Sequence, residues 1–400
     1  MKKILSLLIA GLLLVSLVAC GDSETDTDTD SKSNVVEKEY VEDEAKTGKF
    51  EYDTNEKGEL EITRYEANTV NEIDLVLPTE AKDGRLITGI KEGVFKGLST
   101  IKSVKIPSSY EYIGDYAFAG CNILETVTID VKIDEETGEI LECVENIGTG
   151  AFMKCTALKS ITLPSVVTEI PEHLFSECAA LETIDLSNVI SIQNGAFTKC
   201  SSLKKVTLSD ELDYATRKAF LGCDKLEYTV EDGLCYLGSK TNKTLLLVCP
   251  ESLNIEKATV SANTKIVADN AFINCTDIKN LKLSDSIKII NGTSFESCPD
   301  DIYTVYENGK YLGTEENPYM VLISIEMPNV EDFTIHKDTK IITDTALAET
   351  ATLRDIAFEG TAKDWQAIIR SAEWTNDLTV YIYCDGSSDP IIEPIADVQD

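Results

Sequence analysis

The chain has 400 residues, and its 70 Asp and Glu side chains against 36 Lys and Arg give a formal charge of −34 at pH 7. Because nucleic acid and anionic lipid headgroups repel so negative a surface, neither is an expected partner. A catalytic Ser-His-Asp or Cys-His arrangement would have to use His173 or His336, the only two histidines, so we expect no enzyme.

The first twenty residues are typical of a secretory signal. Two lysines precede an apolar run from Ile4 to Val18, which is too short for a membrane-spanning helix. The run ends in Leu-Val-Ala-Cys-Gly, which resembles a bacterial lipobox, where cleavage precedes a cysteine that carries diacylglycerol. We predict a lipoprotein signal peptide over residues 1–19 and a lipid on Cys20, since two or more acyl chains hold a protein durably to a bilayer. An ordinary signal peptide that happens to contain a cysteine is the alternative.

Residues 20–46 are predicted to be an acidic, disordered tether. Between residues 21 and 46 the chain has ten acidic side chains and three lysines, and it has too little apolar surface to order itself. Alternate aspartates followed by Glu37 imitate the spacing of a calcium loop. Ser31 replaces the turn glycine of such a loop, however, and no helices flank the segment, so we expect no metal there.

A motif of about 23 residues then recurs along the chain as Ala-Phe-x-x-Cys-x-x-Leu-x-x-Ile-x-Leu. A unit of this size is too short to enclose a core, so its apolar side chains can leave water only against neighbouring units. We predict a β-rich solenoid in which each unit forms one coil, the strands form a parallel sheet and the aromatic rings stack as a spine. The marker residues are Phe95, Phe118, Phe152, Phe175, Phe197, Phe220, Phe272, Phe295 and Leu347.

Seven of the twelve cysteines occupy one repeat position, three residues after the phenylalanine. Leu98 and Thr350 occupy this position in the first and last coils, which indicates a small inward-facing site and a buried column of free thiols. A disulfide ladder along the column and a metal site are the less favoured alternatives, and a pairing of Cys235 with Cys249 stays open. The seven cysteines are Cys121, Cys155, Cys178, Cys200, Cys223, Cys275 and Cys298.

Three insertions interrupt the regular spacing. The acidic stretch from Val131 to Cys143 is predicted to be a loop or short hairpin. Two longer modules begin at Tyr228 and Tyr303, which are 75 residues apart, as are Phe220 and Phe295, so each module was duplicated together with its coil. Each module has short β-type runs on both sides of a polar turn, which indicates a hairpin that projects from the stack.

The two ends of the solenoid need caps, because open ends expose unpaired strand edges. At the carboxyl end, Thr361 and Asp364 form a helix-start signature, and Trp365 lies on the apolar face of the short helix that follows. The expected domain is residues 47–385, with an amino-terminal cap at about 47–86, coils at about 87–358, a carboxyl-terminal cap at 359–385 and a loose tail at 386–400.

Several motifs together resemble a known family. An Ile-Gly pair precedes Ala-Phe at residues 113–118 and 147–152, residues 311–319 read YLGTEENPY, and residues 358–365 read FEGTAKDW. They resemble the BspA-type leucine-rich repeat surface proteins of bacteria. The resemblance implies leucine-rich repeats stacked as a right-handed superhelix, in a surface adhesin or binding protein that contacts host matrix proteins or other microbes. Several coils depart from the pattern by losing the Ile-Gly pair, as at residues 169–171, which read Glu-Ile-Pro, and at residues 212–214, which read Leu-Asp-Tyr.

Two surfaces could contact a partner. The outward row of the predicted sheet is small and polar and lacks the Trp, Tyr and Arg typical of interfaces, which favours a plain solvated face. The row comprises Lys105, Thr128, Thr162, Asp185, Thr207 and Lys282. The modules concentrate tyrosines, which are candidate partner contacts, although packing of the hairpins onto the stack would also explain them. These tyrosines are Tyr228, Tyr236, Tyr303, Tyr306, Tyr311 and Tyr319.

We therefore expect a lipid-anchored monomer on the extracellular face of a bacterial envelope that recognises proteins or glycans of a host or of neighbouring bacteria. It would touch the membrane only through its anchor, and no glycine-rich phosphate loop suggests a cofactor. The alternative is a passive structural or spacer protein of the envelope. An extracellular hydrolase built on a carboxylate pair is the least favoured.

Overall fold

The computed structural model describes residues 40–42, 46–239, 242–248, 255–273, 275–326, 329–348, 350–370, 374–375 and 378–393. The chain divides into two compact units, residues 1–37 and residues 38–400, and every described residue belongs to the second. The expected signal peptide and Cys20 lie outside the described residues, as does most of the expected tether. No helix in the described ranges is long and apolar enough to cross a membrane.

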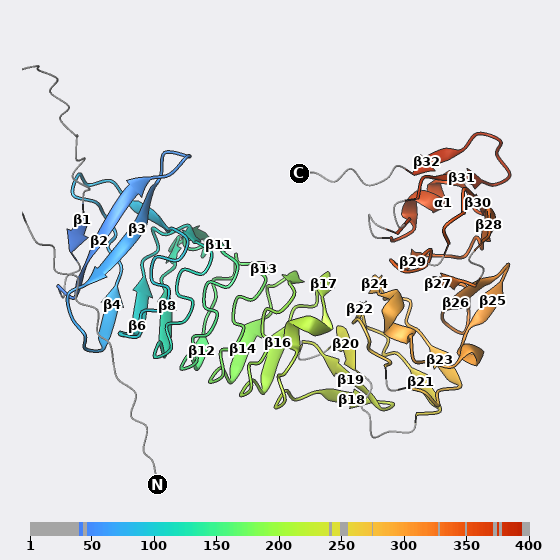
Figure 1. Ribbon diagram of the computed structural model, residues 1–400, viewed down its shortest axis with the longest axis horizontal. Helices are drawn as coiled ribbons and strands as arrows, with labels where there is room; N and C mark the ends of the chain where they lie inside the picture. The colour runs from blue at the N-terminus through green and yellow to red at the C-terminus, as the bar shows by residue number, and fades with distance from the viewer. Residues whose placement is uncertain are drawn as a thin grey trace, which may run out of the picture. The chain divides into compact units, whose positions relative to one another are not determined.

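The second unit is a β-solenoid, as the repeat predicts (Figure 1). Each coil contributes short strands to two rows, and neighbouring strands in a row are parallel, as where Val104 lies opposite Val127. The first row contains β4 (Ile73–Val76), β6 (Ile101–Ile106), β8 (Thr126–Ile129), β12 (Ser160–Ile161), β14 (Thr183–Leu186), β16 (Lys205–Leu208), β21 (Lys257–Thr259) and β23 (Asn280–Lys282). The second row contains β5 (Ile87–Ile90), β7 (Tyr112–Ile113), β11 (Asn146–Ile147), β13 (Glu169–Ile170), β15 (Ser191–Ile192), β17 (Tyr214–Ala215), β22 (Ile266–Val267), β24 (Ile289–Ile290) and β29 (Ile341–Ile342).

An antiparallel hairpin covers the amino-terminal end of the stack. Strands β2 (Gly48–Thr54) and β3 (Leu60–Ala67) pair with each other, β1 (Tyr40–Glu42) adds to β2, and β3 pairs in parallel with β5. Phe50 and Tyr65 pack on Phe95, with ring centroids 6.4 and 5.5 Å from it. The hairpin therefore protects the first coil's strand edge and continues its aromatic core.

The predicted aromatic spine is present in two runs. Rings from Phe95 to Phe220 stack with successive centroids 4.8, 5.5, 5.9, 5.6 and 5.5 Å apart. Phe272 and Phe295 form a second stacked pair at 5.2 Å. Leu347 is fully buried in a separate carboxyl-terminal cluster. Within each run, neighbouring coils thus pack through equivalent rings, which is how units too short for a core of their own bury their apolar surface.

The cysteine column is buried, and its contacts explain the choice of residue. The Cys178 Sγ lies 3.1 Å from the Phe152 carbonyl oxygen of the preceding coil, to which the thiol donates. A compact apolar side chain with a weak donor suits a position that faces a buried carbonyl. The same contact, at 3.1 to 3.2 Å, is made by Cys121, Cys155, Cys200 and Cys223.

One expectation about the cysteines needs correction, and the pairing that was open for Cys235 is excluded. Cys275 is disulfide-bonded, so the column is not made of free thiols throughout. Cys235 is a free thiol that lies opposite Val248 across a β-ladder, so it does not pair with Cys249, which is outside the described residues. Cys298 is free and only partly buried, with its sulfur 4.0 Å from the Phe272 carbonyl oxygen.

The thiol column should make the fold sensitive to alkali. Burial raises the pKa of the Cys121 and Cys178 thiols to about 12. Because a raised pKa favours the protonated thiol in the folded state, this stability is complete below the unfolded pKa of about 9 and is lost as pH rises toward 12. We expect the urea midpoint to fall between about pH 8 and about pH 10.5, and to fall less in Cys178→Ala than in the unmodified chain. Equal pH dependence in the two proteins would contradict this.

The acidic insertion forms the predicted hairpin, in which β9 (Lys132–Ile133) and β10 (Ile140–Glu142) are antiparallel. The two longer modules differ from the prediction. Each is a three-stranded antiparallel unit whose last strand joins the second row, β20 pairing with β22 and β27 with β29. The modules comprise β18 (Thr229–Glu231), β19 (Leu234–Leu237) and β20 (Leu245–Val248), and then β25 (Thr304–Tyr306), β26 (Gly309–Leu312) and β27 (Val321–Ile325).

The modules therefore do not project as whole hairpins. The first strands, β18 and β25, are exposed or partly exposed, whereas the second and third strands are mostly buried. Leu245, Leu246 and Leu247 are all buried, as are Val321 and Leu322. Since neighbouring residues of a strand face opposite sides, a strand without a polar face must be covered on both. The hydrophobic core accordingly separates into three clusters, with Leu245 and Leu247 in the first and Leu246 in the second.

The carboxyl-terminal end is a sheet with one short helix beside it. The helix α1 (Ala362–Ala367) has the predicted capping box between Thr361 and Asp364, and Trp365 is buried against Phe358 and Trp374. The sheet contains β28 (Asp332–Ile335), β30 (Asp355–Phe358), β31 (Val380–Cys384) and β32 (Ile391–Glu393). Because β32 pairs antiparallel with β31, residues 391–393 are not part of a loose tail, as the sequence had suggested.

Candidate binding groove

The modules interrupt the second row of strands at two places. Strand β22 pairs with β20 and β24, and β29 pairs with β27, so β17 and β24 each end a sheet in the described part of the chain. The 3₁₀ helices η1 (Arg217–Phe220) and η2 (Gly292–Phe295) follow these two edge strands. A third, η3 (Asp300–Ile302), leads into the second module. Each interruption leaves a hollow beside the edge strand.

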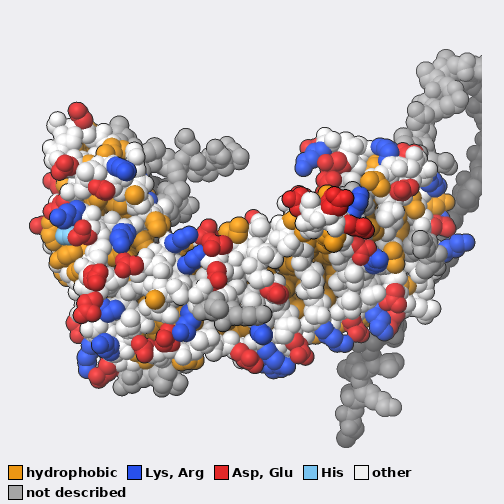
Figure 2. Space-filling model, turned by 180° about the vertical axis from the view of Figure 1, so that it is seen from behind, with side chains coloured by type: hydrophobic (Ala, Val, Ile, Leu, Met, Phe, Trp, Pro, Cys, Tyr) orange, Lys and Arg blue, Asp and Glu red, His pale blue; other side chains and the backbone are white. Residues whose placement is uncertain are grey.

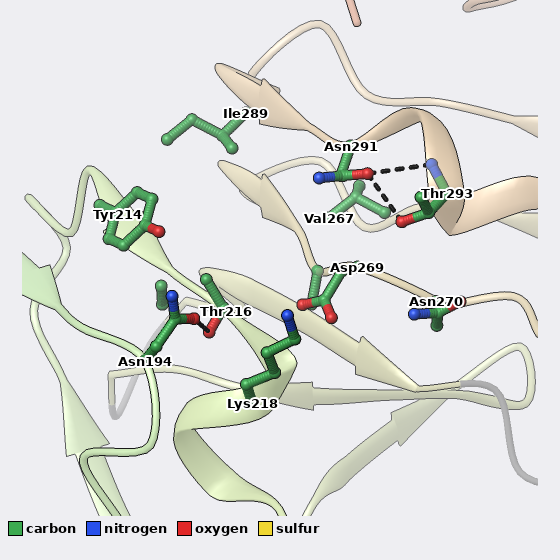
Figure 3. A pocket seen from close by; sticks show the side chains of 12 residues that line it. Asn194, Tyr214, Thr216, Lys218, Val267, Asp269, Asn270, Ile289, Asn291 and Thr293 are labelled. Carbon is green, nitrogen blue, oxygen red and sulfur yellow. Dashed lines mark hydrogen bonds between the residues drawn. The ribbon is translucent and has the colours of Figure 1, made fainter. Parts of the chain in front are cut away.

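The first hollow is a cavity of about 360 Å³ between the coil of β17 and the coils of β22 and β24. In Figure 3 the Tyr214 hydroxyl and the Lys218 ammonium point into the space that Asp269 and Asn291 face from the other side. Val267 and Ile289 add apolar surface to the lining.

The second hollow, of about 460 Å³, adjoins the first and shares Tyr214, Ile289 and Asn291 with it. Its lining is more apolar, and its charged residues are Lys288, Asp344 and Arg370 among those that the structure describes. Because three residues belong to both hollows, we treat them as one continuous surface and call it the interruption groove. Its apolar lining in the second hollow is made by Ile289, Ile290, Ile341, Ile342 and Ile369.

Aspartates bridge both interruptions in the same way. Asp269 Oδ1 accepts a hydrogen bond from the Arg217 main-chain N–H at 2.8 Å. Asp344 Oδ1 accepts from the Gly292 N–H at 3.1 Å, and its Oδ2 accepts from the Asn291 amide at 2.9 Å. Asp269 and Asp344 are 75 residues apart, as are Arg217 and Gly292, so the duplication preserved the bridge. These bonds fix the 3₁₀ helices that wall the groove.

Side-chain hydrogen bonds also orient the neutral polar groups. The Thr216 hydroxyl donates to Asn194 Oδ1 at 2.9 Å, which leaves the Asn194 amide nitrogen directed away from that bond. Asn291 Oδ1 accepts from the Thr293 N–H at 2.9 Å and from its hydroxyl at 2.7 Å (Figure 3). The amides are thereby held in fixed orientations before any ligand arrives.

The charges around the groove are largely balanced. At the rim, Lys288 Nζ lies 3.2 Å from an Asp213 carboxylate oxygen. Burial, with smaller contributions from the charges of Asp269 and Glu172, raises the pKa of Tyr214, so its hydroxyl stays protonated and can donate. Lys218 makes no ion pair with any described residue.

The six candidate tyrosines are not gathered into one contact surface. Tyr236 and Tyr311 are 1% and 0% exposed, which contradicts their prediction as partner contacts, because the module strands that carry them lie inside the core. Tyr228 and Tyr303 are half-buried against core clusters.

Tyr306 and Tyr319 pack around His336. The Tyr319 and His336 rings stack with centroids 4.0 Å apart, and the Tyr306 ring meets His336 edge-on at 5.0 Å. The Tyr306 hydroxyl donates to Glu359 at 2.6 Å. These contacts attach the second module to the last coils, so packing accounts for both tyrosines.

The outward strand row is a solvated face. Lys105 pairs with Asp130 at 3.1 Å, and the other members of the row project outward between inward-facing residues. Ion pairs join neighbouring coils beside it, such as Lys159 with Glu125 at 2.9 Å and Lys204 with Glu182 at 3.2 Å. Figure 2 shows acidic and basic side chains interspersed over one face. Exposed pairs of this kind stabilise little and indicate no docking surface.

Sequence reasoning did not find the groove, although one signal marks it. Tyr214 stands in the coil just before the first module, where Leu212-Asp213-Tyr214 replaces the usual Ile-Gly pair. In the ladder, Tyr214 occupies the position of Ser191 in the preceding coil. A departure from the repeat next to an insertion was therefore the available indication of a special site. No cluster that could hold a metal occurs among the described residues.

Comparisons with known proteins place the repeats in one family. The model of the BspA type leucine rich repeat region matches residues 82–143, 134–243 and 249–368, in six copies. A search of curated proteins finds no match.

Several solved structures are similar to the chain. One is a leucine rich cell surface protein from Faecalibacterium prausnitzii, 21% identical over 82% of this chain and 97% of that one, with a TM-score of 0.41. Another is a leucine rich repeat protein of T. pallidum, 22% identical over 65% and 92% of the two chains, with a TM-score of 0.33. A third is the pneumococcal vaccine antigen PcpA, 16% identical over 86% and 98%, with a TM-score of 0.34.

Proposed function

The chain belongs to the BspA-type leucine-rich repeat family, and from that membership we propose that it is a lipid-anchored recognition protein of the bacterial cell surface. Its partners would be proteins or glycans of a host or of neighbouring bacteria. The observation that supports recognition best is the interruption groove, a concave surface whose polar groups are held in fixed orientations.

The anchor is supported by the sequence. The apolar run that ends in Leu-Val-Ala-Cys20-Gly suits export and lipidation of Cys20, and the acidic residues that follow would hold the solenoid away from the membrane. A repeat domain carried in this way presents its side chains to the surroundings of the cell.

The test compares three bacterial strains that produce the full chain, the Cys20→Ala variant or no protein. We expect the full chain in the membrane fraction and Cys20→Ala in the medium or another soluble fraction, because the acyl chains supply the membrane affinity. Attachment of the cells to immobilised matrix proteins, mucins and neighbouring bacteria should fall in Cys20→Ala to the level of the strain without the protein. Membrane association of Cys20→Ala would contradict the anchor.

The same strains distinguish recognition from a passive spacer role, which the plain solvated strand face favours. A spacer predicts that loss of the protein changes envelope properties, such as sensitivity to detergent, while attachment stays the same. Equal attachment of all three strains to every surface tested would therefore refute recognition and leave the spacer.

A further inference from the structure

We propose that the interruption groove binds a neutral oligosaccharide, with one sugar ring against Tyr214. This inference rests on the proposed recognition function and specifies its ligand class and site.

The polar lining consists mainly of groups that both donate and accept hydrogen bonds. Asn270 contributes an amide and Tyr214 a phenol. Asn194 keeps its amide N–H groups, Asn291 keeps the amide N–H that does not bond to Asp344, and the Thr216 hydroxyl oxygen can still accept. A sugar hydroxyl also donates and accepts at one atom, so amides and hydroxyls suit it better than a surface of one charge. The bonds within the Asn194 and Asn291 pairs hold these groups in position, which reduces the entropy lost on binding.

Apolar groups alternate with the polar ones. Tyr214, Val267 and Ile289 line the first hollow, and isoleucines continue the apolar surface into the second. A sugar ring presents a face of C–H groups edged by hydroxyls, so it needs an aromatic or aliphatic surface with hydrogen-bonding groups around it. Tyr214 belongs to both hollows and is the only aromatic side chain among the described residues that line them.

The charge of the first hollow argues for an uncharged ligand. Among the described residues that line it, Lys218 and Asp269 are the only charged ones, so this lining is formally neutral in a chain of charge −34. One Asp269 oxygen is already occupied by the Arg217 N–H. An acidic sugar would meet the field of the whole chain with one lysine to balance it.

The size of the groove suits more than one sugar ring. Small-molecule sites usually occupy about 300–1,000 Å³, and each hollow, at about 360 and 460 Å³, lies in that range. Because the hollows adjoin at Tyr214, a linear chain of several sugars could contact both.

The test uses Tyr214→Ser, a change that the fold already accepts. Ser191 occupies the equivalent ladder position one coil earlier, so serine fits the strand and leaves the core unchanged. The matched control is Tyr381→Ser, which removes a tyrosine that is 38% exposed on β31 and lines neither hollow. Thermal unfolding of both variants would establish that they fold.

The full chain is titrated in a calorimeter with chitotetraose, maltotetraose, mannotetraose and, as the acidic probe, tetragalacturonate. We expect saturable binding of at least one neutral tetrasaccharide, weakened about tenfold or more by Tyr214→Ser and unchanged by Tyr381→Ser. Three results would overturn the proposal: no neutral tetrasaccharide binds, only tetragalacturonate binds, or both variants bind equally well.

The oligosaccharide site can be refuted while the proposed recognition function stands. If cells attach to a surface through the full chain but no neutral tetrasaccharide binds, recognition stands and the oligosaccharide site is refuted. Saturable binding of extended peptides without tetrasaccharide binding would refute it too, and would indicate strand addition at the free edge of β17.

Discussion

A chain with Phe175 replaced by alanine is expected to lose about 3–5 kcal/mol of unfolding free energy. Phe175 is 0% exposed, and its ring lies between those of Phe152 and Phe197, at 5.9 and 5.6 Å. Removing the Phe175 ring leaves a cavity in the aromatic spine, and the rings of Phe152 and Phe197 both lose the surface that they pack against. The neighbouring coils are held by their own strand pairing, so they cannot collapse into the space.

Urea unfolding followed by circular dichroism measures this loss. The matched control is Val166→Ala on the adjacent coil, where the side chain is 38% exposed and the expected change is within about 0.5 kcal/mol. If Phe175→Ala and Val166→Ala unfold at the same urea concentration, the stacked rings do not hold the coils together.

The solenoid could be predicted because its signal is local and repeated. Each copy of the motif places Phe, Cys and Leu at the same offsets. Because the spacing recurs in several coils, it cannot be a chance resemblance of one segment. The cysteine position is an example, since the presence of Leu98 and Thr350 at the same repeat position indicates a small inward-facing packing site. The capping box at Thr361 could be found for a similar reason, because it depends on residues three apart.

The paths of the modules could not be predicted, because they depend on pairings between distant residues. The run from Leu245 to Val248 is compatible with an exposed hairpin strand or a buried one, and only its pairing with β22 decides between them. The groove follows from the same pairing. Tyr214 and Asp269 are 55 residues apart and meet only because β20 occupies the ladder position beside β22.

Strand β20 lies between two core clusters, so a charge buried on one side of it should disrupt the cluster on that side. We expect Leu246→Asp to unfold the coils that follow the first module while the coils before it stay folded. Leu246 is 0% exposed and faces the second core cluster, whereas its neighbours Leu245 and Leu247 face the first. A carboxylate at this place would be buried without a partner, at a cost of several kcal/mol, and should disrupt the coils that pack against this side of β20.

Hydrogen exchange read by mass spectrometry distinguishes local from global loss. Amides of the strands from β21 to β24 should lose protection, whereas those from β6 to β16 should keep it, because in a stack of repeats each coil is stabilised by its nearest neighbours. Leu221→Asp adds the same charge at a side chain that is 58% exposed and should leave both regions protected. Full protection after Leu246 in the Leu246→Asp chain would show that β20 does not separate two cores. Loss of protection throughout would show instead that the solenoid folds as one cooperative body, which would make the module a part of a single core.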